Sequence, residues 1–583
     1  MTSTRPRLDA RSAARLAEDL ERFLGDPREP GSRISFRTQL HHDDRDEPAP
    51  DAFAALREWG LPRYFVPEAD GGEFRDIDEL FTLFRVLSRR DMTPALSLAA
   101  TFLACLPTWG WGSAEQRARV AELVGSGALG TFGLSEPDHG CDVTAAELTA
   151  EPDGDGYLLS GTKWPVGNGT RGAFATIFAR TGAPGPRGFS AFLVEKAALD
   201  PARWSPEHRA LTLGLRGADV SGINFDRCPV PASALIGLRG HGLDEAIKTL
   251  QLSRVLVTGM CLGAADTGLR VTLDHIRSRV LYGKTVHELP VIREQVLAAY
   301  ADLLIADCVT APVNRAFSVA PERQSLWSSV TKYLVPMLTD DALGSLSGVL
   351  AARHYLREGV ADGMFQKLLR DNRIVSVFEG TSHVHQHVVA TQLPSLLTGQ
   401  VPESGLLRPL FSRAEDPLGW DLRFGRFQLS NGGADEITQS WPAAVAELDG
   451  TGPAWTSLRA LAAEIDRARS KLHEDATELL RAERSLTSTA RGFGLSRRHC
   501  LLHAAACCVH TLLANRDSDF TGFLGQPEWV VLCLQRILTR LGTEQYLDPA
   551  CAPVVEAEML RCWREGALFS LTPLAVADPR EPR

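Results

Sequence analysis

The sequence predicts an α+β protein, mainly α, in which a central β domain separates two helical regions and a helical extension follows. Up to about residue 130, apolar residues recur at helical spacing. Short β-rich runs broken by Gly, Pro and Asp come next, and helical spacing then returns. This order favours an α+β assembly over a doubly wound sheet.

The first predicted domain is helical and covers residues 1–130. The runs "IDELFTLFRVLSRRD" and "ALSLAATFLACLPTWGWG" have apolar residues three and four apart, as on the buried face of a helix. A further helix, "AEQRARVAELVGSG", is expected to end at Gly125 and Gly127. The polar stretch "HHDD", His41 to Asp44, is expected to be a solvated loop.

The second predicted domain, residues 131–238, is a small sandwich or barrel. Its clearest strands are "GYLLSGTKWPVGNG", "FATIFART", "FSAFLVEK" and "SGINFDRCPV". No GxGxxG follows a strand, so the sequence does not support a Rossmann dinucleotide site.

Helices return in residues 239–398, where "VIREQVLAAYADLLIADCVTAPVNRAF" is long and regularly patterned. Residues 399–583 are predicted to form a linker rich in turn residues, followed by a helical extension. A chain of 583 residues is too long for one core, which agrees with several packed domains.

Composition limits the possible partners. The formal net charge of -10 argues against nucleic acid as the main ligand, and no uninterrupted apolar run is long enough to predict a membrane span. The N-terminus lacks the features of a secretory signal. The 11 cysteines show no CxxC spacing, so free thiols in the cytoplasm are expected.

No metal site is predicted. His383, His385 and His387 form an HxHxH run, but on a helix these three positions do not share one face. A nucleophile motif of the GxSxG type is also absent from the sequence.

Four further blocks follow one another along the chain: "LSEPDHGCD", "SGTKWPVGNG", "SRVLYGK" and "FQKLLRDNRIVSVFEGTSHV". They resemble the patterns TEPxxGSD, NGxKxWITNG, RxxFGK and EKLxRDxxIxxIYEGTxxI of the acyl-CoA dehydrogenase family, and "GLRGAD" with "FDRCPVPASALIG" resembles the end of that family's β domain. The resemblance covers roughly residues 50–395. The resemblance implies an N-terminal helical domain, a central β domain and a C-terminal four-helix-type bundle. The extension is similar to that of the longer family members.

The resemblance implies that Glu379, in the "FEGT" block, is the catalytic base that removes an α-proton from an acyl thioester. Such a base needs a pKa raised by apolar surroundings, which Ile374, Val375, Val377 and Phe378 could provide. Taken alone, the EGT motif favours a carboxylate at a helix N-terminus, where the dipole stabilises it, and the preceding "QKLLRD" context shifts the interpretation to a base. Some relatives carry the base elsewhere, at a position that Ser253 occupies here.

The resemblance also implies FAD as cofactor, bound between the β domain and the bundle, with its adenosine end held partly by a neighbouring subunit. Nine residues match positions that the family uses around the cofactor: Leu134, Ser135, Cys141, Pro165, Gly167, Arg279, Tyr282, Thr381 and His383. Three match substrate-binding positions: Cys141, Arg254 and Gly380.

Several positions depart from the family pattern. Pro165 stands where the family has a tryptophan against the flavin, and Gly167 stands where a threonine usually bonds flavin N5. Pro290 replaces a glutamine after the RxxFGK block, and "GVLAARHY" replaces QxxGGxGY at the neighbour's FAD. These changes bear more on hydride transfer than on α-proton removal.

The first functional hypothesis is therefore an FAD-dependent α,β-dehydrogenase acting on an acyl thioester of coenzyme A or of a carrier protein. A second keeps only the α-carbanion and closes a cyclopropane by displacing a halide, without net oxidation. A third is an acyl-CoA oxidase, and a fourth is a non-catalytic partner that has lost the flavin. By resemblance, a homodimer is expected.

Overall fold

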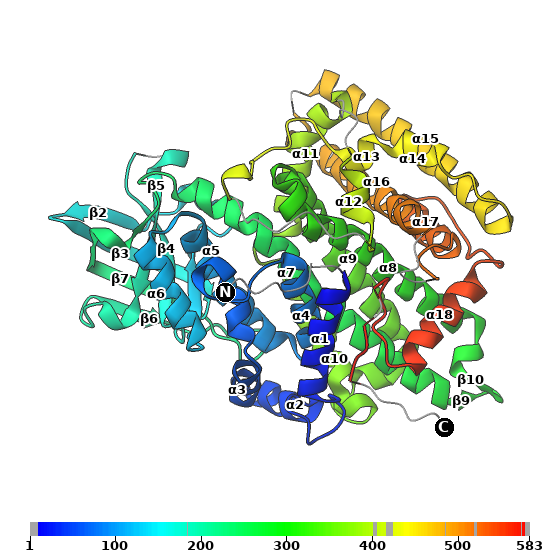
Figure 1. Cartoon of the computed structure of the whole chain (residues 1–583), viewed down its shortest axis with the longest axis horizontal. Helices are drawn as coiled ribbons and strands as arrows, with labels where there is room; N and C mark the ends of the chain where they lie inside the picture. Colours follow the sequence, from blue (N-terminus) through cyan, green and yellow to red (C-terminus); the bar gives the residue numbers. More distant parts are fainter. Residues whose placement is uncertain are drawn as a thin grey trace, which may run out of the picture.

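The mixed sheet projects to one side of a large helical body in the computed structural model, and the last helices of the chain cover the opposite side (Figure 1). The structure describes residues 10–183, 185–399, 405–414, 424–483, 485–517, 522–572 and 574–577. The predicted class, α+β and mainly α, is confirmed.

Six α-helices precede the sheet in the described residues from 10 onward, and α4 and α5 pack against the long helix α7 of the bundle. Side-chain caps define their starts: Asp76 and Asp91 accept backbone N–H groups at α4 and α5, and Ser113 begins α6 with a capping box. The six helices are α1 (Ala10–Leu24), α2 (Phe36–Arg45), α3 (Pro50–Trp59), α4 (Ile77–Ser88), α5 (Met92–Trp111) and α6 (Ala114–Gly125).

One sequence expectation in this region is wrong. The "HHDD" stretch from His41 to Asp44 is not a loop but the last part of α2, which begins behind the cap residue Ser35. Asp43 is buried, and Arg370, far away in the chain, compensates its charge by donating a hydrogen bond to it over 2.6 Å. A tertiary ion pair thus gives this polar run a structural role.

The eight-stranded sheet has the order β6-β7-β3-β2-β4-β5-β8, and β1 pairs with β4 in parallel. The pairing of β3 with β7 shifts register between Lys163 and Val166, at the end of β3 nearest the bundle. The strands are β1 (Gly130–Gly133), β2 (Thr149–Asp153), β3 (Gly156–Gly167), β4 (Phe174–Arg180), β5 (Phe189–Glu195), β6 (Trp204–Glu207), β7 (Val220–Pro231) and β8 (Leu235–Ile236).

Four long helices form the bundle, with α7 and α8 both packed against α9, and α11 along α9 as well. Pro290 sits at the first turn of α8, where its missing N–H leaves no hydrogen bond unmade. The bundle helices are α7 (Gly242–Ser278), α8 (Pro290–Val319), α9 (Gln324–Leu350) and α11 (Ser382–Thr398), and the short α10 (Met364–Asn372) precedes α11.

Two helices, α5 and α8, are long and apolar enough to cross a membrane by length and composition. In the apolar window of each, 83% and 94% of the residues are buried inside the protein. Burial in the protein core therefore accounts for the apolar character of these two helices.

The extension lies over the bundle, and its central helix α16 contacts α8, α11, α15 and α17 (Figure 1). Because it is surrounded by helices, α16 is buried along most of its length. The extension helices are α12 (Leu407–Phe411), α13 (Glu436–Gln439), α14 (Trp441–Ala446), α15 (Pro453–Ala482), α16 (Ala490–Asn515), α17 (Glu528–Arg540) and α18 (Ala552–Arg564).

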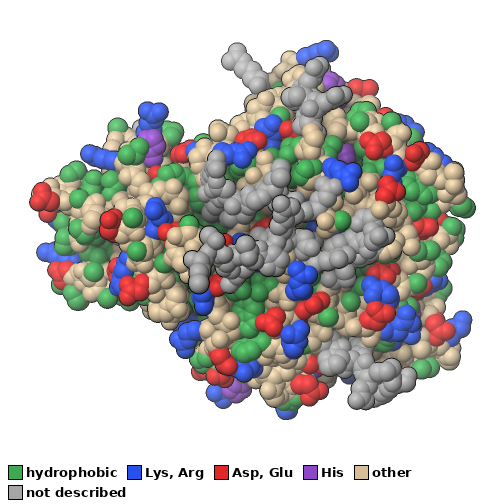
Figure 2. Space-filling view, in the orientation of Figure 1, with side chains coloured by type: hydrophobic (Ala, Val, Ile, Leu, Met, Phe, Trp, Pro, Cys, Tyr) green, Lys and Arg blue, Asp and Glu red, His purple; other side chains and the backbone are tan. Residues whose placement is uncertain are grey.

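Charged side chains are mixed over the face of the molecule shown in Figure 2, where acidic and basic groups alternate among apolar ones. The net negative charge of the chain is therefore spread over the described part of this face rather than gathered in one field.

Candidate active site

A cavity of about 840 Å³ lies between the sheet and the bundle, with mainly apolar walls. It is bordered by α5, by the end of β3 and by α7, and the segment between α10 and α11 completes it. Nine of the residues predicted from the sequence line it together: Leu134, Ser135, Cys141, Pro165, Gly167, Arg254, Glu379, Gly380 and Thr381. Elements far apart in the sequence thus form one pocket.

Glu379 enters this pocket from a tight turn. Its φ is 57° and that of Gly380 is 99°, so two consecutive residues adopt left-handed backbone conformations. A non-glycine residue in that region is uncommon and is frequently found at functional sites. Thr381 then caps α11 by accepting the N–H of Val384. The turn connects the short helical segment Arg373–Ser376 to α11, and Glu379 lines the pocket from this turn.

Three side chains hold Glu379 and its backbone. The Ser253 hydroxyl donates to Glu379 Oε2 over 2.8 Å, and Arg254 Nε donates to the Glu379 carbonyl oxygen over 3.1 Å. Lys332 Nζ, from α9, donates to the carbonyl oxygens of Val375 and, over 2.8 Å, of Phe378. Ser253, which occupies the alternative base position, therefore has a partner: it positions the glutamate.

The surroundings of Glu379 increase its affinity for a proton. Burial raises the pKa of this carboxyl, although Lys332, the Ser253 hydrogen bond and Arg254 act in the opposite direction. Burial also lowers the pKa of Lys332 to about 8 and that of Arg254 to about 10. A carboxylate with a raised pKa beside an apolar cavity is suited to act as a general base near neutral pH.

The "QKLLRD" segment before Glu379 anchors this region. Lys367 Nζ donates to Asp91 over 2.6 Å and to Asp371 over 2.5 Å, and all three side chains are buried. Arg370 donates to Asp43 and, over 2.7 Å, to the Leu213 carbonyl oxygen. The base therefore follows a helix tied to the N-terminal helices and to the β domain.

On the sheet side, the loop after β1 is held by a buried ion pair between Glu136 and Lys163. Lys163 Nζ lies 2.7 Å from Glu136 Oε1 and also donates to the Leu134 carbonyl oxygen over 3.0 Å. Glu136 accepts the backbone N–H groups of Glu147 and Leu148. Glu136 lies in the "LSEPDHGCD" block and Lys163 in the "SGTKWPVGNG" block, but their pairing was not predicted. The sequence signal for it was an acid in one block and a lysine in the other.

Two of the departures from the family pattern, Pro165 and Gly167, face the same pocket. Pro165 and Gly167 line it and offer no side-chain hydrogen-bond donor. A Cβ at Gly167 would lie only 2.8 Å from the Cβ of Ala100 in α5. The close approach of α5 therefore excludes any side chain, including a hydroxyl, at this position.

Three predicted residues lie outside the residues that line the pocket. Arg279 caps the C-terminus of α7, just before the hairpin of β9 (Val280–Leu281) and β10 (Lys284–Thr285). Tyr282 lies in the turn of that hairpin and is 92% exposed. His383 is exposed on α11. Their roles toward the cofactor remain predictions that depend on a neighbouring subunit.

The three histidines of the HxHxH run, His383, His385 and His387, do not point toward one common site. His383 and His387 are exposed, whereas His385 is buried and its Nε2 lies 3.1 Å from the Gly380 carbonyl oxygen. This contact supports the turn at Glu379 rather than a metal ion.

Comparisons with known proteins agree with this architecture. Residues 131–228 match the acyl-CoA dehydrogenase middle domain, and residues 240–393 match the acyl-CoA dehydrogenase C-terminal domain. The human mitochondrial short-chain specific acyl-CoA dehydrogenase is 28% identical over 342 residues, which cover 57% of this chain and 80% of the human protein.

Solved structures share the fold at lower sequence identity. The acyl-CoA dehydrogenase from Bacillus anthracis, solved as a complex with FAD, has a TM-score of 0.71 at 18% identity and covers 97% of this chain and 92% of its own. The prolyl acyl carrier protein oxidase AnaB has a TM-score of 0.59 at 21% identity and covers 66% and 98% respectively. The first of these likenesses extends over the C-terminal extension.

Proposed function

Since residues 131–228 and 240–393 belong to the acyl-CoA dehydrogenase family, we propose that this chain is an FAD-dependent α,β-dehydrogenase of acyl thioesters. The observation that carries the proposal is the placement of Glu379. Its carboxylate lies in the wall of an apolar cavity formed jointly by the sheet and the bundle, and burial raises its pKa.

The pocket suits a flavin. Its walls of Leu134, Pro165 and Val166 offer apolar contact to a planar ring, and the hydroxyls of Ser135 and Thr381 are available as polar partners beside it. The loop that carries Leu134 and Ser135 is fixed by the buried Glu136–Lys163 pair, so its backbone is held ready for a ligand. Bound FAD would supply the acceptor for the hydride that leaves the β-carbon.

The chain's own residues perform the first step. Glu379 accepts the α-proton on its carboxylate, and Ser253 keeps that carboxylate oriented. Lys332 and Arg254 bind the carbonyl oxygens of Phe378 and Glu379 and so hold the backbone that carries the base. Apolar walls exclude water, which keeps the proton affinity of the base high.

The acyl group is proposed to lie along the apolar part of the cavity. Residues of α5 and α7 form this part: Leu96, Ala100, Leu103, Leu243, Ile247 and Leu250. The thioester is carried by coenzyme A or by the pantetheine arm of a carrier protein. The human relative acts on acyl-CoA by its name, and AnaB is named for a prolyl carrier protein.

A redox-neutral reaction is the second candidate. It is favoured by Pro165 and Gly167, which place no side-chain donor in the pocket where the family resemblance leads one to expect aromatic and hydroxyl groups. In this reaction Glu379 still removes the α-proton, and the carbanion displaces a halide on the acyl chain to close a cyclopropane.

The deciding experiment is anaerobic titration of the FAD-loaded protein with acyl-CoA and acyl-carrier thioesters, followed by flavin absorbance and product mass. Dehydrogenation predicts bleaching of the flavin and loss of two hydrogens from the acyl chain. Release of halide without bleaching would instead establish the redox-neutral reaction. Hydrogen peroxide formed in air would identify an oxidase. If no thioester bleaches the flavin, releases halide or exchanges its α-proton, the proposal is wrong.

We also propose a cytoplasmic homodimer. All 11 cysteines are free, which suits a reducing compartment. Tyr282 and Tyr355 expose most of their side-chain surface, as expected of residues that contact a second copy. Sedimentation of the purified protein tests the dimer, since a monomer at micromolar concentration would refute it.

A further inference from the structure

A second group of chemically active side chains lies in the extension, away from the proposed active site. Asp435, His499 and His503 are buried, with exposed side-chain fractions of 0%, 6% and 0%. The Nε2 atom of His499 and the Nδ1 atom of His503 each lie 3.8 Å from Asp435 Oδ2. We propose that these three residues bind a divalent transition-metal ion, with Zn²⁺ as the best fit.

The two histidines are arranged for chelation by the helix that carries them. His499 and His503 are four residues apart on α16, so their rings project from the same face. Asp435 comes from the residue before α13 and approaches that face from across the extension. One ligand atom from each of the three residues lies within 4.8 Å of the others. Small side-chain rotations would bring these atoms to the spacing of ligands around one ion.

Three of the four histidine nitrogens make no hydrogen bond of normal geometry: His499 Nε2 and both ring nitrogens of His503, all of them buried. The His503 ring also interacts with the buried thiol of Cys507. The distance of 3.8 Å to the Asp435 carboxylate is too long for a hydrogen bond. Buried polar atoms without partners are rare in folded proteins, because they have lost water without replacing it. A metal ion bound between them would use the free nitrogen lone pairs.

The carboxylate is already oriented by its surroundings. Trp327 Nε1, from α9 of the bundle, donates to Asp435 Oδ1 over 2.8 Å, and Thr438 donates to Oδ2 over 2.5 Å. The Asp435 N–H donates to Gln439 Oε1. Hydrogen bonds of this kind fix metal-binding carboxylates in place, and they connect the proposed site to the bundle.

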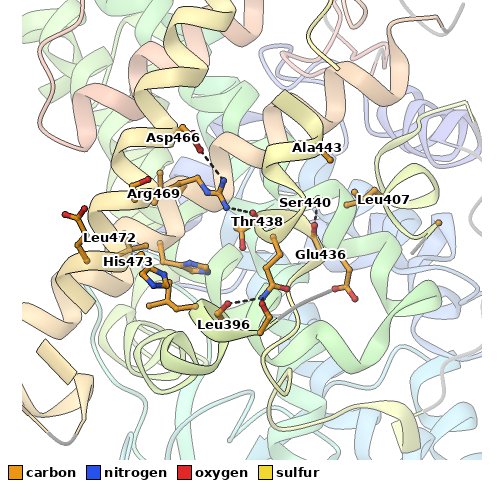
Figure 3. A pocket seen from close by; sticks show the side chains of 18 residues that line it. Leu396, Leu407, Glu436, Thr438, Ser440, Ala443, Asp466, Arg469, Leu472 and His473 are labelled. Atoms are coloured by element: carbon orange, nitrogen blue, oxygen red, sulfur yellow. Dashed lines mark hydrogen bonds and ion pairs between the residues drawn. The ribbon is translucent and has the colours of Figure 1, made fainter. Parts of the chain in front are cut away.

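The group borders a cavity of about 1240 Å³ between the end of α11, the short helices α13 and α14, and the pair α15–α16. Its lining residues include Glu436, Thr438 and Arg469, which Figure 3 labels. His499 is a fourth lining residue. Arg469, the only cation among these residues, already has partners: it lies 3.6 Å from Asp466 and donates a hydrogen bond to the Thr438 carbonyl oxygen. The cavity gives the proposed ion room for a water as its fourth ligand.

The ligand chemistry selects the metal. Two imidazoles, each of which must give up any proton on its ligand nitrogen to bind the ion, and one carboxylate suit Zn²⁺ and its neighbours in the first transition row. Mg²⁺ and Ca²⁺ prefer a shell of oxygen atoms. An ion held by residues from α16 and from the start of α13 would cross-link the extension. Binding to the folded state alone would then raise thermal stability.

The test uses the full-length protein, stripped with a chelator and then dialysed against Zn²⁺ or Co²⁺. Mass-spectrometric metal analysis is expected to show metal equimolar with the chain, and the Co²⁺ form is expected to show d–d absorption in the visible range. Zn²⁺ is expected to raise the melting temperature. His499→Ala and His503→Ala, alone and combined, should lose the bound metal and the shift.

Two controls keep the result interpretable. His473→Ala removes an exposed histidine that lines the same cavity, and His387→Ala removes one on α11; both should bind metal like the wild type. Circular dichroism checks that each variant is folded, and Asp435→Asn supplies a milder change if an alanine variant is not. Equal metal content in the wild type and the folded double variant would overturn the proposal. A wild type that binds neither Zn²⁺ nor Co²⁺ would also overturn it. The three residues would then form only a buried His503–Asp435 ion pair.

Discussion

The Ser253 hydroxyl lies 2.8 Å from Glu379 Oε2 and donates a hydrogen bond to it, across 126 residues of sequence. Ser253 occupies the position where some relatives carry the base, and here it supports a base supplied by another segment. The hydrogen bond stabilises the ionised carboxylate, whereas burial favours the protonated one. The balance between these effects sets the proton affinity on which the proposed reaction depends.

Replacing Glu379 by Gln should strongly slow α-proton removal, because the amide keeps the shape of the side chain but cannot accept the proton. Turnover and α-proton exchange in D₂O are expected to fall about a hundred- to ten-thousandfold. Glu245→Gln is the matched control, since Glu245 is a buried carboxyl on α7 that does not line the pocket. If exchange persists in the Glu379 variant, another group is the base.

Replacing Ser253 by Ala should raise the pKa of Glu379, because the ionised carboxylate loses a donor. A base must be deprotonated to act, so the acid limb of the pH–rate profile is expected to move to higher pH. The activity loss should therefore be larger at acid pH than at alkaline pH. Ser253→Thr keeps the hydroxyl and should restore the profile. An equal loss at every pH would show that Ser253 does not tune the base.

Glu245 should make stability depend on pH. Burial and the neighbouring Asp244 raise the pKa of its carboxyl to about 8, from an ordinary value of 4.5, and its Oε2 atom has no hydrogen-bond partner. Between these two values the folded protein keeps a proton that the unfolded chain has lost. The free energy of unfolding should therefore fall as pH rises through this window.

Urea denaturation at several pH values within that window measures this dependence. Glu245→Gln carries no titrating proton, so its unfolding free energy should fall less steeply over the same range than that of the wild type. Parallel curves for the two proteins would assign the pH dependence to other groups.

Breaking the buried Lys163–Glu136 pair should destabilise the β domain. Removing one partner, as in Lys163→Met, leaves a buried carboxylate uncompensated and is expected to cost about 3–5 kcal/mol. The double variant Lys163→Met with Glu136→Gln should recover part of this loss. Denaturant unfolding of the four proteins in a double-mutant cycle gives the coupling. A coupling near zero would mean that the pair does not hold the loop after β1.

Much of the site was predictable because its motifs are local. The "FEGT" block identified Glu379, and the blocks around Leu134 and Pro165 identified one wall of the cavity. Because these motif blocks follow one another in the order that the family has, the resemblance alone predicted that they share one pocket. The cofactor roles of Arg279 and Tyr282 stay predictions, since both residues lie outside this pocket, at the end of α7 and in the hairpin after it.

Other features needed the folded chain. The "HHDD" stretch looked solvated because its composition is polar, yet Arg370 pairs with Asp43 and makes it part of a buried network. His499 and His503 did carry a local signal, their spacing on α16. Their third partner, Asp435, is separated from them by the whole of α15.

The sequence by itself determined the succession of helices and strands and, through a family resemblance, singled out Glu379 as the proposed base, because periodicity and short motifs are properties of neighbouring residues. Tertiary structure alone decided that Ser253 supports Glu379 and that Asp435 meets the two histidines. The physical reason is distance along the chain: such pairs form only when separate helices pack side by side. Their register is set by the fit of whole surfaces, which no short stretch of sequence contains.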